Sequence, residues 1–181
     1  MTWTDAPGMA AMFAAHDRLR GEMTSLARLT VRGGRNPRRV LRTAAGWRSF
    51  KHALRVHFAA EDKALWPPLR HALAHRPDSL ALLEAIEAEH TALHLLIEVI
   101  DEQVAAPSQA LADAGPGALG DLTDSLVTGL TGHLAHEEHA ALPLLRQTIT
   151  PPQWAHFAHL HTRLTAADAA QTGPERWSTT P

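Results

Sequence analysis

The sequence predicts an all-α protein, an up-down-up-down four-helix bundle with a short C-terminal fifth helix. Three observations support this fold class. Residues that favour helices (Ala, Leu, Arg and Glu) dominate the 181 residues, whereas β-branched residues are few. Apolar residues recur at steps of three and four along long stretches, the spacing that gives a helix one apolar face. Gly and Pro gather between these stretches, where they end one helix and begin the next.

The first two helices are expected in the N-terminal part of the chain. Apolar residues at helical spacing predict a helix over about residues 7–31, which the Gly33-Gly34 pair ends. Asn36-Pro37 supplies an N-cap and a proline for the first turn of a second helix, which reaches about Trp66. A short segment follows, bounded by Pro67-Pro68 and Pro77-Asp78.

The third and fourth helices are expected over about residues 79–104 and 121–142, and Pro143 kinks or ends the fourth. The stretch between them is rich in Ala, Gly, Pro and Asp and is interpreted as a loop over residues 105–120. A short fifth helix is predicted from Thr150 to about Leu164. Four long helices with short connections are typical of an up-and-down bundle. We therefore expect one bundle domain over residues 1–165 and a flexible tail over residues 166–181.

The composition excludes several classes of function. A formal net charge of -2 argues against nucleic-acid and anionic-membrane binding, because both require a positive field. The absence of Cys excludes disulfide scaffolds, Cys-ligated metal sites and thiol nucleophiles, and the absence of Tyr excludes tyrosyl chemistry. No basic segment followed by an apolar one begins the sequence, and no stretch has the ~18 apolar residues of a membrane span, so a cytoplasmic protein without an evident protein partner is expected. Against these absences stand 13 His, the commonest metal ligand.

One motif occurs twice. The residues His-Phe-Ala-Ala-Glu-Asp at 57–62, followed by Pro67, match His-Leu-Ala-His-Glu-Glu at 133–138, followed by Pro143. Upstream of each copy a helix carries a lone histidine, at 41 residues' distance for His16 and 43 for His90. The chain is therefore interpreted as a helix pair used twice, which in a bundle places two equivalent sets of side chains across a pseudo-twofold axis.

These motifs predict a metal centre. Residues four apart lie ~40° apart around a helix, so His57 and Glu61 share a face, as do the equivalent pairs on the other two helices. The complete candidate set is His16, His57, Glu61, His90, His94, His133 and Glu137. To bury two carboxylates and five imidazoles among apolar neighbours without a metal would carry a large desolvation penalty. Seven ligands suit two metal ions bridged by the carboxylates, and mixed nitrogen and oxygen ligands suit iron, with manganese or zinc as alternatives.

The two halves differ at one position of the repeat. His94 follows His90 by four residues, whereas Arg20 holds that position after His16. Arginine does not bind metals in this way, so one metal would receive three imidazoles and the other only two. We expect an open coordination position at the second metal, where dioxygen, peroxide or nitric oxide would bind.

The order of motifs, H…HxxxE…HxxxH…HxxxE, resembles that of the hemerythrin-like (HHE cation-binding) domains over about residues 9–145. The resemblance implies a four-helix bundle around a non-haem di-iron centre with an oxo or hydroxo bridge. It implies that one iron is held by His90, His94 and His133 and the other by His16 and His57, with bridges from Glu61 and Glu137. In oxygen-carrying hemerythrins the last motif is HxxxxD, so this chain places a longer carboxylate one position earlier.

The sequence leaves three functions open. The first is a di-iron protein that binds or senses dioxygen, or holds iron. The second is a di-iron oxidoreductase that decomposes peroxide or oxygenates a small molecule, for which no catalytic residue is assigned. The third is a structural protein with zinc or no metal. The roles of His136, His139 and a cluster of three histidines on the fifth helix also stay open: His156, His159 and His161.

Overall fold

The computed structural model describes residues 7–32, 45–105 and 118–171, and every regular element in these ranges is a helix. This confirms the all-α class. In chain order the elements are α1 (Pro7–Arg32), α3 (Ala45–Ala64), α4 (Trp66–Ala72), α5 (Pro77–Ala105), α7 (Ala118–His136), η2 (Glu137–Ala141), α8 (Leu142–Thr148) and α9 (Pro151–Gln171). None of these helices is long and apolar enough to cross a membrane.

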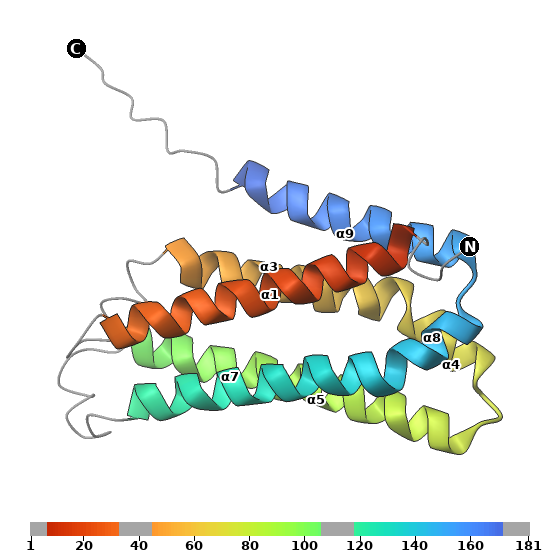
Figure 1. Ribbon diagram of the computed structural model, residues 1–181, viewed down its shortest axis with the longest axis horizontal. Coiled ribbons are helices and arrows are strands. Elements are labelled where there is room, and N and C mark those ends of the chain that lie inside the picture. Colours follow the sequence, from red (N-terminus) through yellow and green to blue (C-terminus); the bar gives the residue numbers. More distant parts are fainter. Residues whose placement is uncertain (1–6, 33–44, 106–117, 172–181) are drawn as a thin grey trace, which may run out of the picture.

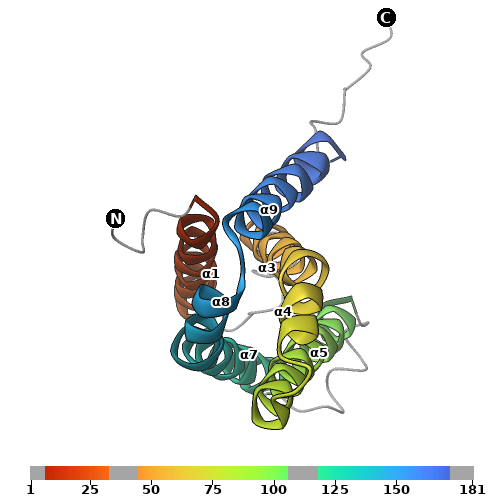
Figure 2. The same ribbon diagram turned by 90° about the vertical axis from the view of Figure 1, so that its right-hand side faces the viewer.

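Four long helices, α1, α3, α5 and α7, lie side by side along the longest axis of the molecule (Figure 1). Seen along that axis, they surround a shared interior (Figure 2). Helix α9 lies outside this ring and packs against both α1 and α3. The short helices α4 and α8 lie together at one end (Figure 1).

The interior consists of two apolar clusters with a polar layer between them. On α1, for example, Met9 and Met12 belong to one cluster and Leu19 and Met23 to the other, and the buried His16 lies between them. The same order holds on α3, on α5 and along α7 with η2, because each has a buried His or Glu where its apolar stripe changes cluster. The apolar periodicity that forms the helices therefore also brings their polar residues to one level of the molecule.

The helix that carries the second copy of the repeated motif is not a regular α-helix throughout. After His136 it widens into the π-helical turn η2, in which the Leu142 N–H donates to the carbonyl of Glu137, five residues earlier. Pro143 follows in the first turn of α8, where its missing N–H is tolerated. The sequence predicts that Pro143 ends or kinks this helix. In the structure the irregularity is instead a π-helical turn, and it precedes Pro143.

Other boundaries differ from the expected ones. Pro67 and Pro68 lie in the first turn of α4, so the segment after α3 is itself helical. Helix α9 continues to Gln171, beyond the expected end at about Leu164. The predicted start of the second helix at Asn36-Pro37, most of the loop over 105–120 and the tail from residue 172 lie outside the described residues.

Candidate metal centre

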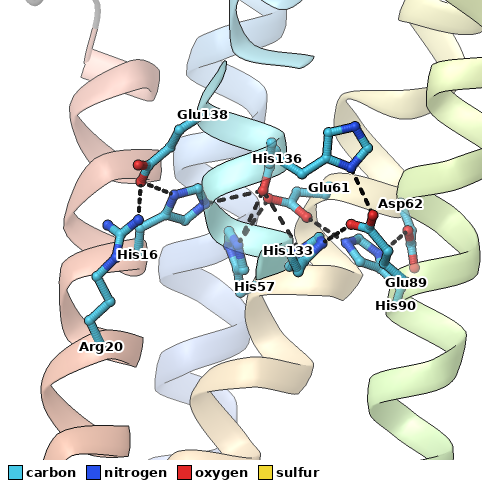
Figure 3. Close-up of polar contacts among 11 residues, drawn as sticks. His16, Arg20, His57, Glu61, Asp62, Glu89, His90, His133, His136 and Glu138 are labelled. Atoms are coloured by element: carbon cyan, nitrogen blue, oxygen red, sulfur yellow. Dashed lines mark hydrogen bonds and ion pairs between the residues drawn. The ribbon is translucent and has the colours of Figure 1, made fainter. Parts of the chain in front are cut away.

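The polar layer gathers histidine and glutamate side chains from all four long helices (Figure 3). His16, His57, Glu61 and Glu137 are fully buried, and each offers a ligand atom within 4.8 Å of the others. His90 and His133 join them from α5 and α7 with 4% and 2% exposure. The structure thus brings together six of the seven residues that the sequence singles out.

The four-residue spacing acts locally as expected. One turn of α3 separates His57 from Glu61, and His57 Nε2 lies 3.1 Å from Glu61 Oε1. In the second copy His133 Nε2 lies 3.9 Å from Glu137 Oε2, a longer separation across the junction of α7 and η2. Both pairs point into the interior because their helices bury the same face.

The imidazoles form two pairs. The rings of His16 and His57 meet edge to face with their centroids 4.8 Å apart, and those of His90 and His133 do the same at 4.8 Å. Each pair belongs to one half of the repeat. The first half supplies its pair from α1 and α3, and the second half supplies its pair from α5 and α7.

The two carboxylates lie between these pairs. Glu61 Oε1 faces His57 at 3.1 Å, whereas its Oε2 faces His90 Nε2 at 3.4 Å. Glu137 Oε2 lies 3.2 Å from His16 Nε2 and 3.9 Å from His133 Nε2. Each carboxylate therefore reaches a histidine of both pairs, which is the arrangement that a bridging ligand requires.

The donor atoms fit a metal. The Nε2 atoms of His16, His57, His90 and His133 are buried without a hydrogen-bond partner, as are all four carboxylate oxygens of Glu61 and Glu137. Buried polar atoms in native proteins are almost always paired, and an orphan costs about 1–3 kcal/mol, more if it is charged. Eight such atoms that face one another are the donor set of a cation site, in which bonds to metal would satisfy them together.

The electrostatics of the layer also favour a cation. Burial and the adjacent carboxylate of Glu137 raise the pKa of Glu61 well above its ordinary value. Burial raises the pKa of Glu137 too, but the adjacent imidazole of His16, 3.2 Å away, and the charges of the nearby histidines outweigh it and lower that pKa. Burial and the neighbouring imidazoles lower the pKa of His57 well below its ordinary value, so this ring stays neutral and able to ligate.

Carboxylates outside the cluster lie against the Nδ1 atoms of three of its imidazoles. His16 Nδ1 donates to Glu138 Oε1 at 2.8 Å, and His133 Nδ1 donates to Glu89 Oε2 at 2.9 Å. Asp62 Oδ1 lies 3.5 Å from His90 Nδ1. Such partners fix the ring orientation and tautomer of metal-binding histidines. Sequence reasoning missed this role, although the repeat contained the signal for two of them, because Asp62 and Glu138 each follow the interior glutamate directly.

The structure also places Arg20 and His136, whose roles the sequence does not assign, beside the outer carboxylates. The Arg20 guanidinium lies 2.8 Å from Glu138 Oε1, so it supports the carboxylate that holds His16 and does not occupy a ligand position. His136 Nδ1 donates to Glu89 Oε1 at 2.7 Å, and it therefore shares with His133 the same outer carboxylate (Figure 3).

His94 lies apart from the cluster. Its ring is half-buried and meets Phe58 edge-on at 5.4 Å, while Phe58 stacks on His90 at 3.7 Å. Among the described residues no carboxylate lies within 4 Å of the His94 ring. The side chain lines a cavity of about 410 Å³ on the outer side of His90.

The remaining histidines lie outside the polar layer. His139 is exposed and its Nδ1 donates to the carbonyl of Ala135 at 2.7 Å. On α9, His156 and His159 are exposed, and His161 is half-buried with its ring centroid 6.0 Å from that of Phe157. Helix α9 therefore covers α1 and α3 from outside, and these three histidines add no ligand to the cluster.

The comparisons with known proteins give one match. The profile of the hemerythrin HHE cation binding domain matches residues 8–145. This range covers α1 to α8 up to Leu145 and contains all seven candidate ligands, whereas α9 lies beyond it. No curated protein and no solved structure matches the chain significantly. With the profile spanning most of the chain and the cluster lying within it, the protein belongs to the hemerythrin HHE cation-binding domain family.

Proposed function

We propose that the polar layer holds two iron ions. His16 and His57 would bind one, and His90 and His133 the other, with His94 as a further ligand to the second. Glu61 and Glu137 would bridge them. The observation that carries this assignment is Glu61, whose two oxygens face histidines of different pairs at 3.1 and 3.4 Å. A carboxylate that served a single metal would turn both oxygens toward one pair.

We also propose the up-down-up-down topology for the bundle. In Figure 1 the sequence colours run in opposite directions along successive long helices, from α1 through α3 and α5 to α7. This arrangement lets both copies of the repeated motif enter the same layer, because α3 and α7 then run in the same direction.

The function that follows is binding of dioxygen or a related small ligand, such as peroxide or nitric oxide, in oxygen or iron binding or sensing. Iron would supply an open coordination position for that ligand. The chain's own contribution is to exclude water and to fix the donors: Glu138 and Glu89 hold the outer nitrogens of His16 and His133, and the two apolar clusters close the layer on both sides.

The metal content tests the proposal. Protein purified after expression with iron should carry close to two iron ions per chain, because the donors form two sets around shared carboxylates. Glu61→Ala should lose most of both ions, whereas the exposed Glu84→Ala on α5 should keep them. Elemental analysis and near-ultraviolet absorption measure the outcome. One tightly held zinc per chain, or two irons retained in Glu61→Ala, would contradict the assignment.

A second candidate is a di-iron oxidoreductase, and the cavity beside His90 favours it. Its volume of about 410 Å³ lies within the usual range of small-molecule sites. An absorption spectrum that changes when dioxygen is added and returns when it is removed would support a binding protein. Catalytic conversion of hydrogen peroxide to water and dioxygen, measured with an oxygen electrode, would support the enzyme.

A further inference from the structure

The polar layer is closed on most sides. His16, His57, Glu61 and Glu137 have no exposed surface. Behind His16, the outer nitrogen meets Glu138, which Arg20 covers in turn. This closure matters because a small ligand must pass through the protein to reach a buried metal.

His90 is the exception. Of the four imidazoles in the cluster, it is the one that borders a described cavity, and its Nε2 lies 3.4 Å from Glu61 Oε2. Its Nδ1 is buried and has no hydrogen-bond partner, with Asp62 Oδ1 at 3.5 Å. One ring therefore joins the wall of the cavity to the bridging carboxylate.

The cavity opens to solvent and is large enough to admit ligands. Asp62, Pro67 and Thr91 on its wall are exposed, so it connects to the surface. Its volume of about 410 Å³ far exceeds the ~30 Å³ that a water molecule occupies in the liquid. Another cavity in the described part of the chain, of about 310 Å³ and lined by Gly21, Ser25 and Gly46 among others, contains no residue of the cluster.

We infer that small exogenous ligands, of the size of azide or dioxygen, reach the centre through the cavity beside His90. His94 lines the same cavity, so this route leads past the histidines that the proposed function assigns to the second metal. This inference rests on the proposed di-iron function.

Thr91 provides the variants that test it. The residue is exposed at the cavity wall on α5, and its hydroxyl donates to the carbonyl of Glu87 at 3.0 Å. A series of Thr91→Val, Thr91→Leu and Thr91→Trp removes the hydroxyl first and then fills the cavity. Ser25→Trp is the matched control, because Ser25 is exposed at the second cavity and its hydroxyl donates to the carbonyl of Gly21 at 2.9 Å.

The measurement is the association rate of azide with the iron-loaded protein, followed by stopped-flow absorption. A parallel measurement follows Co²⁺ uptake by the metal-free protein through its visible absorption. We expect azide association to slow with side-chain size, by about tenfold or more in Thr91→Trp, equivalent to a barrier increase of about 1.4 kcal/mol. The azide association rates of Thr91→Val and Ser25→Trp should stay within about twofold of the parent rate, a difference too small to reflect a blocked path.

The possible results separate the inference from the proposed function. Equal azide rates in Thr91→Trp, Ser25→Trp and the parent, with two irons in each, would overturn the inference and leave the di-iron centre standing. A parent protein that takes up no iron would overturn both. Should Thr91→Trp lose its helical circular dichroism, the Thr91→Leu variant decides, because a slower rate there supports the passage and an unchanged rate refutes it.

Discussion

The position of Glu61 carries an electrostatic penalty in the metal-free protein. Its carboxylate lies between two pairs of imidazoles, as the proposed bridge requires, yet it is fully buried beside a second carboxylate. Burial and Glu137 raise its pKa well above the ordinary value of 4.5. A carboxyl group with a raised pKa binds more protons in the folded than in the unfolded state, so the stability it contributes is full at low pH and is lost as the pH rises.

This predicts a pH-dependent effect of Glu61→Gln on the metal-free protein. The amide cannot ionise, so the variant should gain stability relative to the parent as the pH rises above the unfolded-state value near 4.5. Urea denaturation at several pH values between ~5 and ~8 measures the difference in the free energy of unfolding. The exposed Glu84→Gln should show a constant difference over the same range. A constant difference for Glu61→Gln as well would mean that Glu61 is not a strained buried acid.

Helix α9 lies beyond the residues that the family profile matches, yet it packs as part of the core. Trp154 and Phe157 are buried in the same apolar cluster as Met12 and Leu69. At the start of α1, a Cβ on Gly8 would overlap the carbonyl oxygen of Trp154. The two backbones therefore approach to a distance that only glycine permits.

The packing of α9 predicts a large cost for Phe157→Ala. The side chain is fully buried, so its removal should lower the free energy of unfolding by about 3–5 kcal/mol through lost transfer energy and a cavity. His159→Ala on the exposed face of the same helix should change it by less than about 0.5 kcal/mol. Chemical denaturation of both variants provides the measurement. Similar small effects would show that α9 is only loosely attached.

The polar layer connects all four long helices, so metal binding affects the stability of the whole bundle. The unfolded chain has no preformed site, and a ligand that binds only the folded state stabilises it. The two apolar clusters above and below the layer do not depend on the metal. A metal-free protein should therefore keep its helices while losing part of its stability.

We expect iron to raise the melting temperature. A free metal concentration about 100 times the dissociation constant contributes about 2.7 kcal/mol, which for a chain of this size corresponds to roughly 5–10 °C. Circular dichroism during heating, with and without iron, measures the shift. Glu61→Ala should show little shift in melting temperature, because it lacks the proposed bridging ligand. Equal melting temperatures of the parent with and without iron would argue against a buried centre.

The sequence by itself determined the helical class, the order of the helices and the interior positions of His57, Glu61, His133 and Glu137. These features depend on periodicity along one helix, where residues four apart share a face whatever the surroundings. The duplication of the motif added the correspondence between His16 and His90, and both lie in the polar layer.

The tertiary structure alone decided which side chains meet across helices. Glu138 holds His16 from 122 residues away, and Glu89 holds His133 from 44 residues away, contacts that depend on how each helix is rotated about its axis. The same rotation leaves His94 beside Phe58 at the cavity, although its spacing from His90 is that of a ligand pair. Sequence spacing fixes the face on which a residue lies, but only the packing of neighbouring helices sets the distance from that face to a partner.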